Sequence, residues 1–279
     1  MPRIVMGNRD GAEALRQARA VLAELTDEWP DVPIVQRTIP GDAPDTLPTA
    51  LLEERVGLAV GAVDRLPAQL PDGVLLAAVA RRQEARCALV SRNDRTFDAL
   101  EAGMRVETRA GRDEALLRAL RPDLDVAPFD DALDDALARL TREEVHALLL
   151  PATTLRVLDH GNRANVLLDP EVVPPAPGQG ALGVLVRDGD DEAAELAYTL
   201  HHRPSFDRVR AERAFAAALP DRPVGALATV SDDGDLTLFG AVAHAGRVLQ
   251  ARTTGDAAEA ASLGAELAQD VAAQLDALG

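Results

Sequence analysis

The sequence predicts an α/β protein with substantially parallel sheets, because short apolar strands alternate with amphipathic helices through its first half. Ala12 to Leu25 shows the helical pattern most clearly, with apolar side chains recurring every three or four residues. Val74 to Val79 is an uninterrupted apolar run with the length of a buried strand. Beyond Asp190 the order changes to helices followed by strands, which indicates a separate α+β domain.

Prolines and glycines mark where several of the expected strands and helices end. The turn Pro40-Gly41-Asp42 closes the second strand, Arg121-Pro122 ends a helix, and a proline-rich hinge covers residues 170–177. The expected strands are Arg3–Met6, Val32–Arg37, Val56–Val60, Val74–Val79, Cys87–Ser91, Arg105–Thr108, Leu124–Ala127, Val145–Leu150 and a run after the hinge. The expected helices are Ala12–Leu25, Leu47–Glu54, Arg112–Leu120, Ala132–Leu140 and, after two or three strands around residues 226–251, Ala257–Leu278.

The net charge is −17, with 46 acidic residues against 29 basic ones, and the chain contains no lysine. This balance gives no electrostatic support for binding nucleic acid or an anionic membrane surface. An acidic excess without lysine is typical of a protein that works in concentrated salt, where screening removes self-repulsion. A preference for arginine in a GC-rich genome is the alternative explanation.

Cys87 is the only cysteine, which excludes an intramolecular disulfide and a cysteine-cluster metal site. It lies on an expected core strand, and we interpret it as an inert packed thiol. The N-terminus has no charged region followed by an apolar run, and no stretch is long enough to span a membrane. We therefore expect a cytoplasmic protein without membrane or nucleic-acid partners, and we expect a monomer.

Gly178, Gly180 and Gly183 have the spacing of a dinucleotide-binding loop, which needs a strand before it and a helix after it. Here the preceding segment 172–177 is rich in proline, which cannot donate a hydrogen bond within a central sheet. A strand-like apolar run, residues 181–186, follows the glycines. We therefore predict no nucleotide site at this position.

The segments 177–180 (PGQG), 211–215 (AERAF) and 118–124 (RALRPDL) together resemble the hydroxymethylbilane synthase family, also called porphobilinogen deaminase. The resemblance implies an enzyme that joins porphobilinogen units on the way to haem and other tetrapyrroles. It also implies a fold of two lobes like those of periplasmic binding proteins, plus a small C-terminal α+β domain. We expect lobe 1 at residues 1–92 and 174–189, lobe 2 at 98–170 and the C-terminal domain at 191–279, with crossings near 93–97 and 171–175.

The resemblance implies a dipyrromethane cofactor, bound to a cysteine in the loop between the AERAF helix and the next strand. In this chain that loop is only Pro220-Asp221-Arg222, which offers no sulfur nucleophile for a thioether. We therefore expect no cofactor, although the family would carry dipyrromethane.

A catalytic aspartate is implied in a loop of the form His-Ser-x-Lys-Asp-x-Pro, which here reads GAVDRLP at residues 61–67. Aligned without gaps, the lysine position holds Asp64 and the aspartate position holds Arg65. Asp64 is the one catalytic candidate, if the loop shifts by one residue. An ordinary Asp–Arg surface turn is the alternative.

The family binds substrate carboxylates with arginines, whose guanidinium groups are planar, permanently charged and bidentate. The candidate ligand-binding residues that remain, which would face a small molecule in the interlobe cleft, are Arg9, Thr108, Arg109 and Arg112. The positions at which the resemblance implies further arginines hold Asp113, Asp130, Ala136 and Val157.

Asp130 and Asp134, like Asp131 and Asp135, are four residues apart and project from one helix face. Oxygen ligands suit calcium or magnesium, but no EF-hand spacing or glycine turn organises them. A solvated helix start is the alternative, because aspartate is favourable there without a metal. We expect no metal site, and we interpret His201-His202 as a polar loop or helix end.

Three functions remain open. The leading hypothesis is a hydroxymethylbilane synthase-like paralogue that has kept the fold, lost the chemistry, and binds another ligand or a protein partner. The second is an active, divergent hydroxymethylbilane synthase. The third is a two-lobe small-molecule-binding protein unrelated to tetrapyrroles. The fold cannot decide among them, because function resides in the site.

The charge excess leads to a prediction about salt. Raising potassium chloride from about 0.01 M to about 1 M shortens the screening length from about 30 Å to about 3 Å and so weakens self-repulsion. The midpoint of thermal unfolding, followed by circular dichroism, should therefore rise along this series. A flat or falling midpoint would favour genome composition over a saline setting as the cause.

Overall fold

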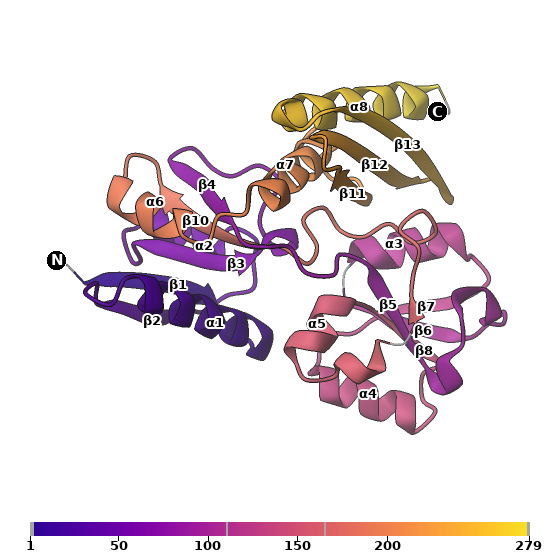
Figure 1. Ribbon diagram of the computed structural model, residues 1–279. Coiled ribbons are helices and arrows are strands. Elements are labelled where there is room, and N and C mark those ends of the chain that lie inside the picture. Colours follow the sequence, from indigo (N-terminus) through magenta and orange to yellow (C-terminus); the bar gives the residue numbers. More distant parts are fainter. Residues whose placement is uncertain (1–2, 110, 165, 278–279) are drawn as a thin grey trace.

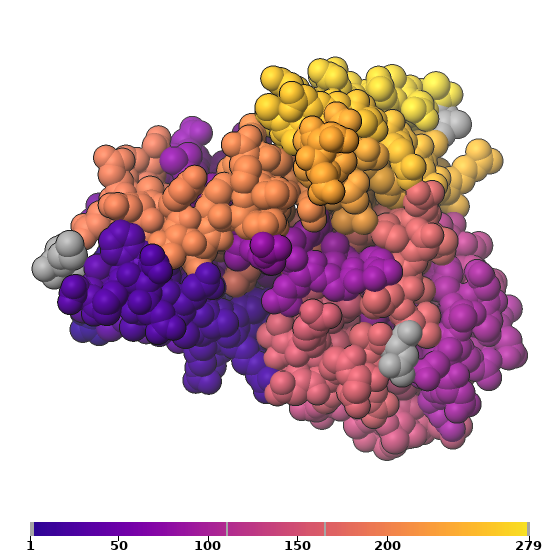
Figure 2. Space-filling view, viewed as in Figure 1, coloured from indigo at the N-terminus to yellow at the C-terminus, as the bar shows by residue number. Residues whose placement is uncertain are grey.

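The computed structural model describes residues 3–109, 111–164 and 166–277, which form three sheets with helices packed on them (Figure 1). The predicted class is confirmed, because two mixed α/β lobes are followed by a smaller α+β domain. The space-filling view shows the third domain, in light orange to yellow, above the junction of the two lobes and over lobe 2 (Figure 2). Within the described residues, no helix is long and apolar enough to cross a membrane.

Lobe 1 contains β1 (Ile4–Arg9), α1 (Ala12–Glu28), β2 (Ile34–Ile39), α2 (Thr46–Leu52), β3 (Leu58–Ala62), β4 (Val74–Val79), β10 (Leu182–Arg187) and α6 (Asp191–Tyr198). The strand order is β2-β1-β3-β10-β4; β1 is parallel to β2 and β3, and β10 is antiparallel to β3 and β4. The helices α1 and α6 bury Leu25 and Leu196 against one face, and α2 buries Leu47 and Leu51 against the other.

Lobe 2 contains β5 (Cys87–Ser91), β6 (Arg105–Thr108), α3 (Gly111–Leu120), β7 (Asp125–Pro128), α4 (Leu133–Thr141), β8 (Ala147–Pro151), α5 (Ala152–Val157) and β9 (Val166–Leu167). The strand order is β7-β6-β8-β5-β9, with β6 parallel to β7 and β8, and β5 antiparallel to β8 and β9. Leu117 of α3 packs on one face of this sheet, and Leu137 of α4 and Leu155 of α5 pack on the other.

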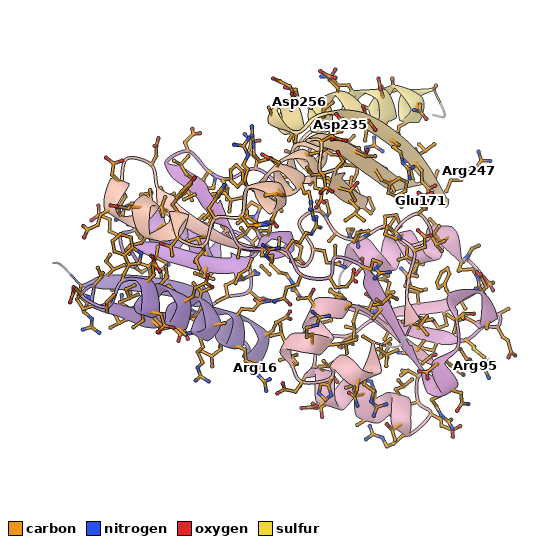
Figure 3. All side chains as sticks on the ribbon, viewed as in Figure 1. Arg16, Arg95, Glu171, Asp235, Arg247 and Asp256 are labelled. Atoms are coloured by element: carbon orange, nitrogen blue, oxygen red, sulfur yellow. The ribbon has the colours of Figure 1, made fainter. Side chains whose placement is uncertain are left out.

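The third domain contains α7 (Arg203–Ala217), β11 (Val224–Val230), β12 (Asp235–His244), β13 (Arg247–Asp256) and α8 (Ala260–Asp276), and its sheet is antiparallel. Gly264 lets α8 approach α7 closely, because a Cβ there would lie 2.2 Å from the carbonyl oxygen of Ala211. The domain also touches the hinge: Gln250 Nε2 donates to the carbonyl of Glu171 at 2.7 Å, and Arg252 pairs with the Glu171 carboxylate. Figure 3 shows Glu171 next to this domain.

Two domain boundaries differ from those expected. The strand Cys87–Ser91 pairs with β8 along its whole length, so it belongs to lobe 2 and the first crossing is at residues 80–86 rather than 93–97. Leu196 and Leu200 pack into the core of lobe 1, so the third domain begins at α7 rather than at residue 191. The first crossing carries no proline or glycine, and an apolar run does not indicate which sheet it will join.

The hinge glycines are required by close packing. Gly178 and Gly180 have φ values of +79° and +77°, which residues with a Cβ rarely adopt. A Cβ on Gly178 would lie 2.4 Å from Cγ1 of Val63, and a Cβ on Gly180 would lie 2.5 Å from the carbonyl oxygen of Glu84. The hinge therefore lies directly against the loop after β3 and against the first crossing.

A buried ion pair joins the three domains. Arg82, from the first crossing, and Glu212, from α7, have side chains only 3% and 0% exposed, and their atoms meet at 2.5 and 3.1 Å. Glu212 also accepts from the backbone N–H groups of Gly178 at 2.6 Å and Ala228 at 2.8 Å. Arg82 Nε donates to the carbonyl of Gln179 at 2.9 Å. One carboxylate thus connects the crossing, the hinge, α7 and β11.

Removing Arg82 should be strongly destabilising, because it leaves Glu212 buried and without its cation. We expect Arg82→Ala to lower the free energy of unfolding by about 3–5 kcal/mol in urea titrations. The matched control is Arg92→Ala, whose partner Glu143 is exposed, and it should change stability by less than about 1 kcal/mol. Equal effects of the two substitutions would show that this pair does not hold the junction.

Candidate functional site

A cleft of about 1190 Å³ lies between lobes 1 and 2. The carboxyl ends of β1, β3, β7 and β8 all open onto it, as expected for a ligand site in sheets of this kind. Carboxylates outnumber guanidinium groups in its lining, whose charged members are Arg9, Arg16, Arg65, Arg81, Arg109, Asp10, Glu13, Glu24, Asp42, Asp64, Asp130, Asp131 and Asp134.

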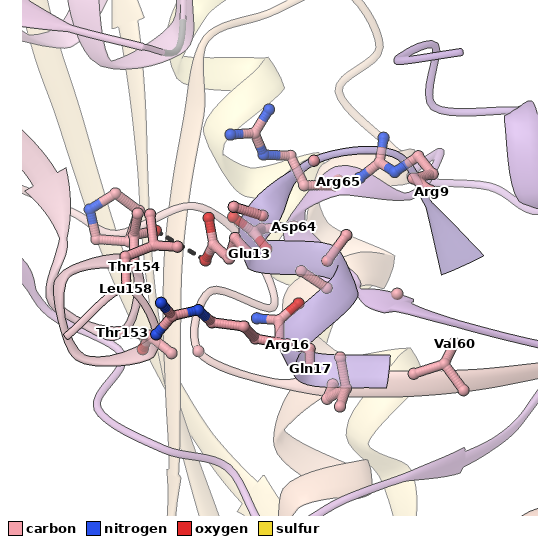
Figure 4. A pocket seen from close by; sticks show the side chains of 18 of the residues that line it. Arg9, Glu13, Arg16, Gln17, Val60, Asp64, Arg65, Thr153, Thr154 and Leu158 are labelled. Carbon is pink, nitrogen blue, oxygen red and sulfur yellow. Dashed lines mark hydrogen bonds between the residues drawn. The ribbon is translucent and has the colours of Figure 1, made fainter. Parts of the chain in front are cut away.

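Asp64 lies in a short 3-10 turn, Val63–Arg65, that directly follows β3. The turn places its half-buried side chain in the cleft wall beside Glu13 (Figure 4). Burial raises the pKa of Asp64 to about 6; Arg65 opposes this rise, and the negative charge of Glu13 adds to it. A carboxyl group with such a pKa can hold or release a proton near neutral pH. The assignment of Asp64 as an acid remains a prediction.

Arg9, at the end of β1, and Arg109, just after β6, both line the cleft. Arg9 is 7% exposed, and its Nη1 donates to the backbone carbonyl of Asp42 at 3.3 Å. Arg109 lies over the ring of Phe129 at 5.2 Å and donates to the carbonyl of Asp131 at 3.0 Å, while its buried Nε has no partner among the described residues. Burial lowers the pKa of both guanidinium groups, so neither charge is fully compensated by its surroundings.

Arg112 is engaged in holding the hinge. Its Nη1 donates to the carbonyls of Pro174 at 2.9 Å and Val224 at 3.2 Å, and its Nη2 pairs with Asp113. Thr108 is fully buried and its hydroxyl lies 3.4 Å from Asp113. The structure therefore brings Arg9 and Arg109 into the large cleft but not Thr108 or Arg112. Arg112 borders a cavity of about 130 Å³ that also touches Asp64 and Arg109.

Sequence reasoning missed a group of residues where α1 meets α5. Glu13 accepts a hydrogen bond from the hydroxyl of Thr154 at 2.9 Å. Arg16 Nη1 donates to the carbonyl of Val157 at 2.9 Å and pairs with Asp159. Helical spacing could have placed Glu13 and Arg16 on one face of α1, but nothing in the sequence indicates that this face meets lobe 2.

The acidic side chains at the start of α4 are held by other side chains. Asp131 pairs with Arg139, which lowers the pKa of that carboxyl, and Asp134 Oδ1 lies 2.8 Å from Nε2 of His160. Within the described residues, no group of three or more side chains is placed to hold a metal ion. His202 caps the start of α7 by accepting from the backbone N–H of Ser205, so it is a helix end.

Cys87 lies in the core of lobe 2. It is fully buried in β5, where Gln179 Nε2 approaches its sulfur at 3.5 Å. Burial raises the pKa of this thiol to about 12. The thiolate, which is the nucleophilic form, is therefore not formed at neutral pH.

The two lobes, the cleft between them and the third domain at their hinge define a two-lobe α/β protein with an interlobe site.

Among solved structures, the chain is similar to an ABC transporter periplasmic substrate-binding protein from Coxiella burnetii. The match covers 75% of this chain and 96% of that protein, with a TM-score of 0.49 and 14% sequence identity. The porphobilinogen deaminases of Thermus thermophilus and Deinococcus deserti are 40% and 36% identical to this chain, over 97% and 98% of its length and 96% of theirs. Residues 4–195 match the family described as "Porphobilinogen deaminase, dipyromethane cofactor binding domain". The chain belongs to the porphobilinogen deaminase family, which excludes the hypothesis of an unrelated two-lobe binding protein.

The expectation of no cofactor is contradicted by this match, because the matched domain is one that binds dipyrromethane. The cleft fits the carboxylates of such a group: Arg9 is buried and donates to the backbone carbonyl of Asp42, and the buried Nε of Arg109 has no partner among the described residues. Arg9 and Arg109, which line the cleft, would hold the carboxylates of the group. Cys87 does not fit its covalent attachment, since the thiol is packed inside a sheet of lobe 2.

The raised pKa of Asp64 predicts how stability depends on pH. The pKa is about 6 in the folded protein against an ordinary value of 3.8, so the folded state keeps this proton longer. Any stability gained from the protonated form is present below pH 4 and is lost as the pH rises through 6. Asp64→Asn should therefore gain about 1–3 kcal/mol relative to the parent between pH 4 and pH 7.5 in urea unfolding. Asp72→Asn, at an exposed site, is the control and should show no such pH-dependent gain.

Proposed function

We propose that this chain is a ligand-binding member of its family in tetrapyrrole biosynthesis that no longer carries out the chain-building reaction. Its interlobe cleft is proposed to bind a small molecule that bears carboxylates. The proposal rests on the replacement of arginine at four positions where the family resemblance implies it. These positions hold Asp113, Asp130, Ala136 and Val157.

None of these four positions offers a cation to a ligand. Asp113 is 4% exposed and neutralises Arg112, and Ala136 is buried in the core of lobe 2. Asp130 presents a negative charge to the cleft, and the carbonyl of Val157 is bonded to Arg16. Each lost charge-assisted hydrogen bond would remove roughly 1.5–3 kcal/mol of ligand binding. A growing polypyrrole, with many acetate and propionate groups, would be bound poorly by such a cleft.

The guanidinium groups that remain support binding of a smaller anion. Arg9, Arg65 and Arg109 all line the cleft around Asp64. They could hold one or two carboxylates through charge-assisted hydrogen bonds. The surrounding acidic side chains would repel a molecule with many more.

One observation favours the alternative, an active and divergent hydroxymethylbilane synthase. Asp64 lies in the cleft with a pKa of about 6, as a general acid or base for pyrrole chemistry would require. The two functions differ in whether porphobilinogen is consumed, and this can be measured directly.

Purified protein incubated with porphobilinogen should consume none of it, as followed by Ehrlich's reagent. Porphobilinogen should nevertheless bind in calorimetry, and Arg65→Ala should weaken binding about tenfold or more, since one charge-assisted bond is lost. Arg247→Ala, an exposed arginine of the third domain, should bind as the parent does. Consumption of porphobilinogen that Asp64→Ala abolishes would overturn the proposal in favour of the active enzyme.

A further inference from the structure

Lobe 1 and lobe 2 touch across the cleft where α1 meets α5. Glu13 and Arg16 lie one turn apart on α1, and both reach α5 of lobe 2 (Figures 3 and 4). Both residues also line the cleft, as do Thr154 and Leu158 on the opposite side. The contact therefore lies at the cleft, where it can oppose separation of the two lobes.

Arg16 binds two acceptors at the end of α5. One is the carbonyl of Val157, the last residue of the helix, which has no partner within the helix itself. The other is the carboxylate of Asp159, just beyond the helix end. The side chains of Arg16 and Asp159 are 45% and 79% exposed, so water can compete for both and the contact can open.

Asp159 has a positive φ, which is uncommon for residues other than glycine. Its φ is +64°, in the left-handed region that commonly holds glycine after a helix. Glycine at this position would end the helix without strain but would offer no carboxylate to Arg16. An aspartate here therefore costs backbone energy and provides the ion pair with lobe 1.

We propose that Glu13 and Arg16 form a strap that holds the two lobes closed, and that Arg16 must release α5 before a ligand enters or leaves the cleft. Closure also fixes Glu13, through the Thr154 hydroxyl, next to Asp64 in the cleft wall. The position of the lobes and the surroundings of Asp64 are coupled by this contact. The strap acts on the opening of the cleft whether the cleft only binds a ligand or also carries out a reaction.

The test measures the distance between the lobes without any ligand. Spin labels are attached at Asp31→Cys in lobe 1 and Asp135→Cys in lobe 2, both exposed sites, while the buried Cys87 thiol stays unlabelled. Pulsed electron paramagnetic resonance should give one main, short distance for the parent. Arg16→Ala should raise the population of longer distances about tenfold, because it removes both a charge-assisted hydrogen bond and an ion pair.

The variants Asp159→Asn and Asp159→Gly distinguish loss of the strap from loss of folding stability. Both remove the carboxylate, but glycine also relieves the left-handed backbone, so Asp159→Gly should open the lobes while leaving urea stability unchanged or higher. Combining Asp159→Asn with Arg16→Ala should open the lobes no further than Arg16→Ala alone. The matched control is Arg37→Ala, an exposed arginine on β2, which should leave the distances unchanged. Parent-like distances in Arg16→Ala, or additive opening by the two substitutions, would refute the strap.

Discussion

The arrangement of the three domains depends on the buried carboxylate of Glu212. A charge without access to water is tolerated only when hydrogen bonds and a counter-charge surround it. Arg82 supplies the counter-charge, and the N–H groups of Gly178 and Ala228 supply two further donors. Because these donors come from the crossing, the hinge and β11, satisfying one side chain fixes the relative position of three chain segments.

The buried pair of Arg82 and Glu212 also helps to position the cleft residue Asp64. Glu212 holds Gly178, and Gly178 packs against Val63, which immediately precedes Asp64. The turn that carries Asp64 therefore lies between the end of β3 and the hinge. Burial of this turn raises the pKa of Asp64, and the charge of Arg65 within the same turn opposes that rise.

Apolar periodicity was sufficient to predict most strands and helices, and the bounds of Val74–Val79 and Cys87–Ser91 agree with the structure. It could not assign Cys87–Ser91 to lobe 2, because that assignment depends on pairing with β8, some sixty residues away. It missed α5, which is too short for an amphipathic repeat. Asp64 was found from its loop and does lie in the cleft, whereas Glu13 was not found, since its contact with Thr154 exists only when the lobes are together.

Arginine has two uses in this acidic chain, and the difference between them bears on the site. Arg112 and Arg139 are neutralised by nearby carboxylates and stabilise the fold. Arg9 and Arg109 have lost water without gaining a comparable partner, and their lowered pKa values reflect that cost. A buried cation that lacks an anion raises the free energy of the empty protein, and a bound carboxylate would relieve it. The anion proposed to bind between the lobes would therefore meet the two guanidinium groups whose charge the fold compensates least.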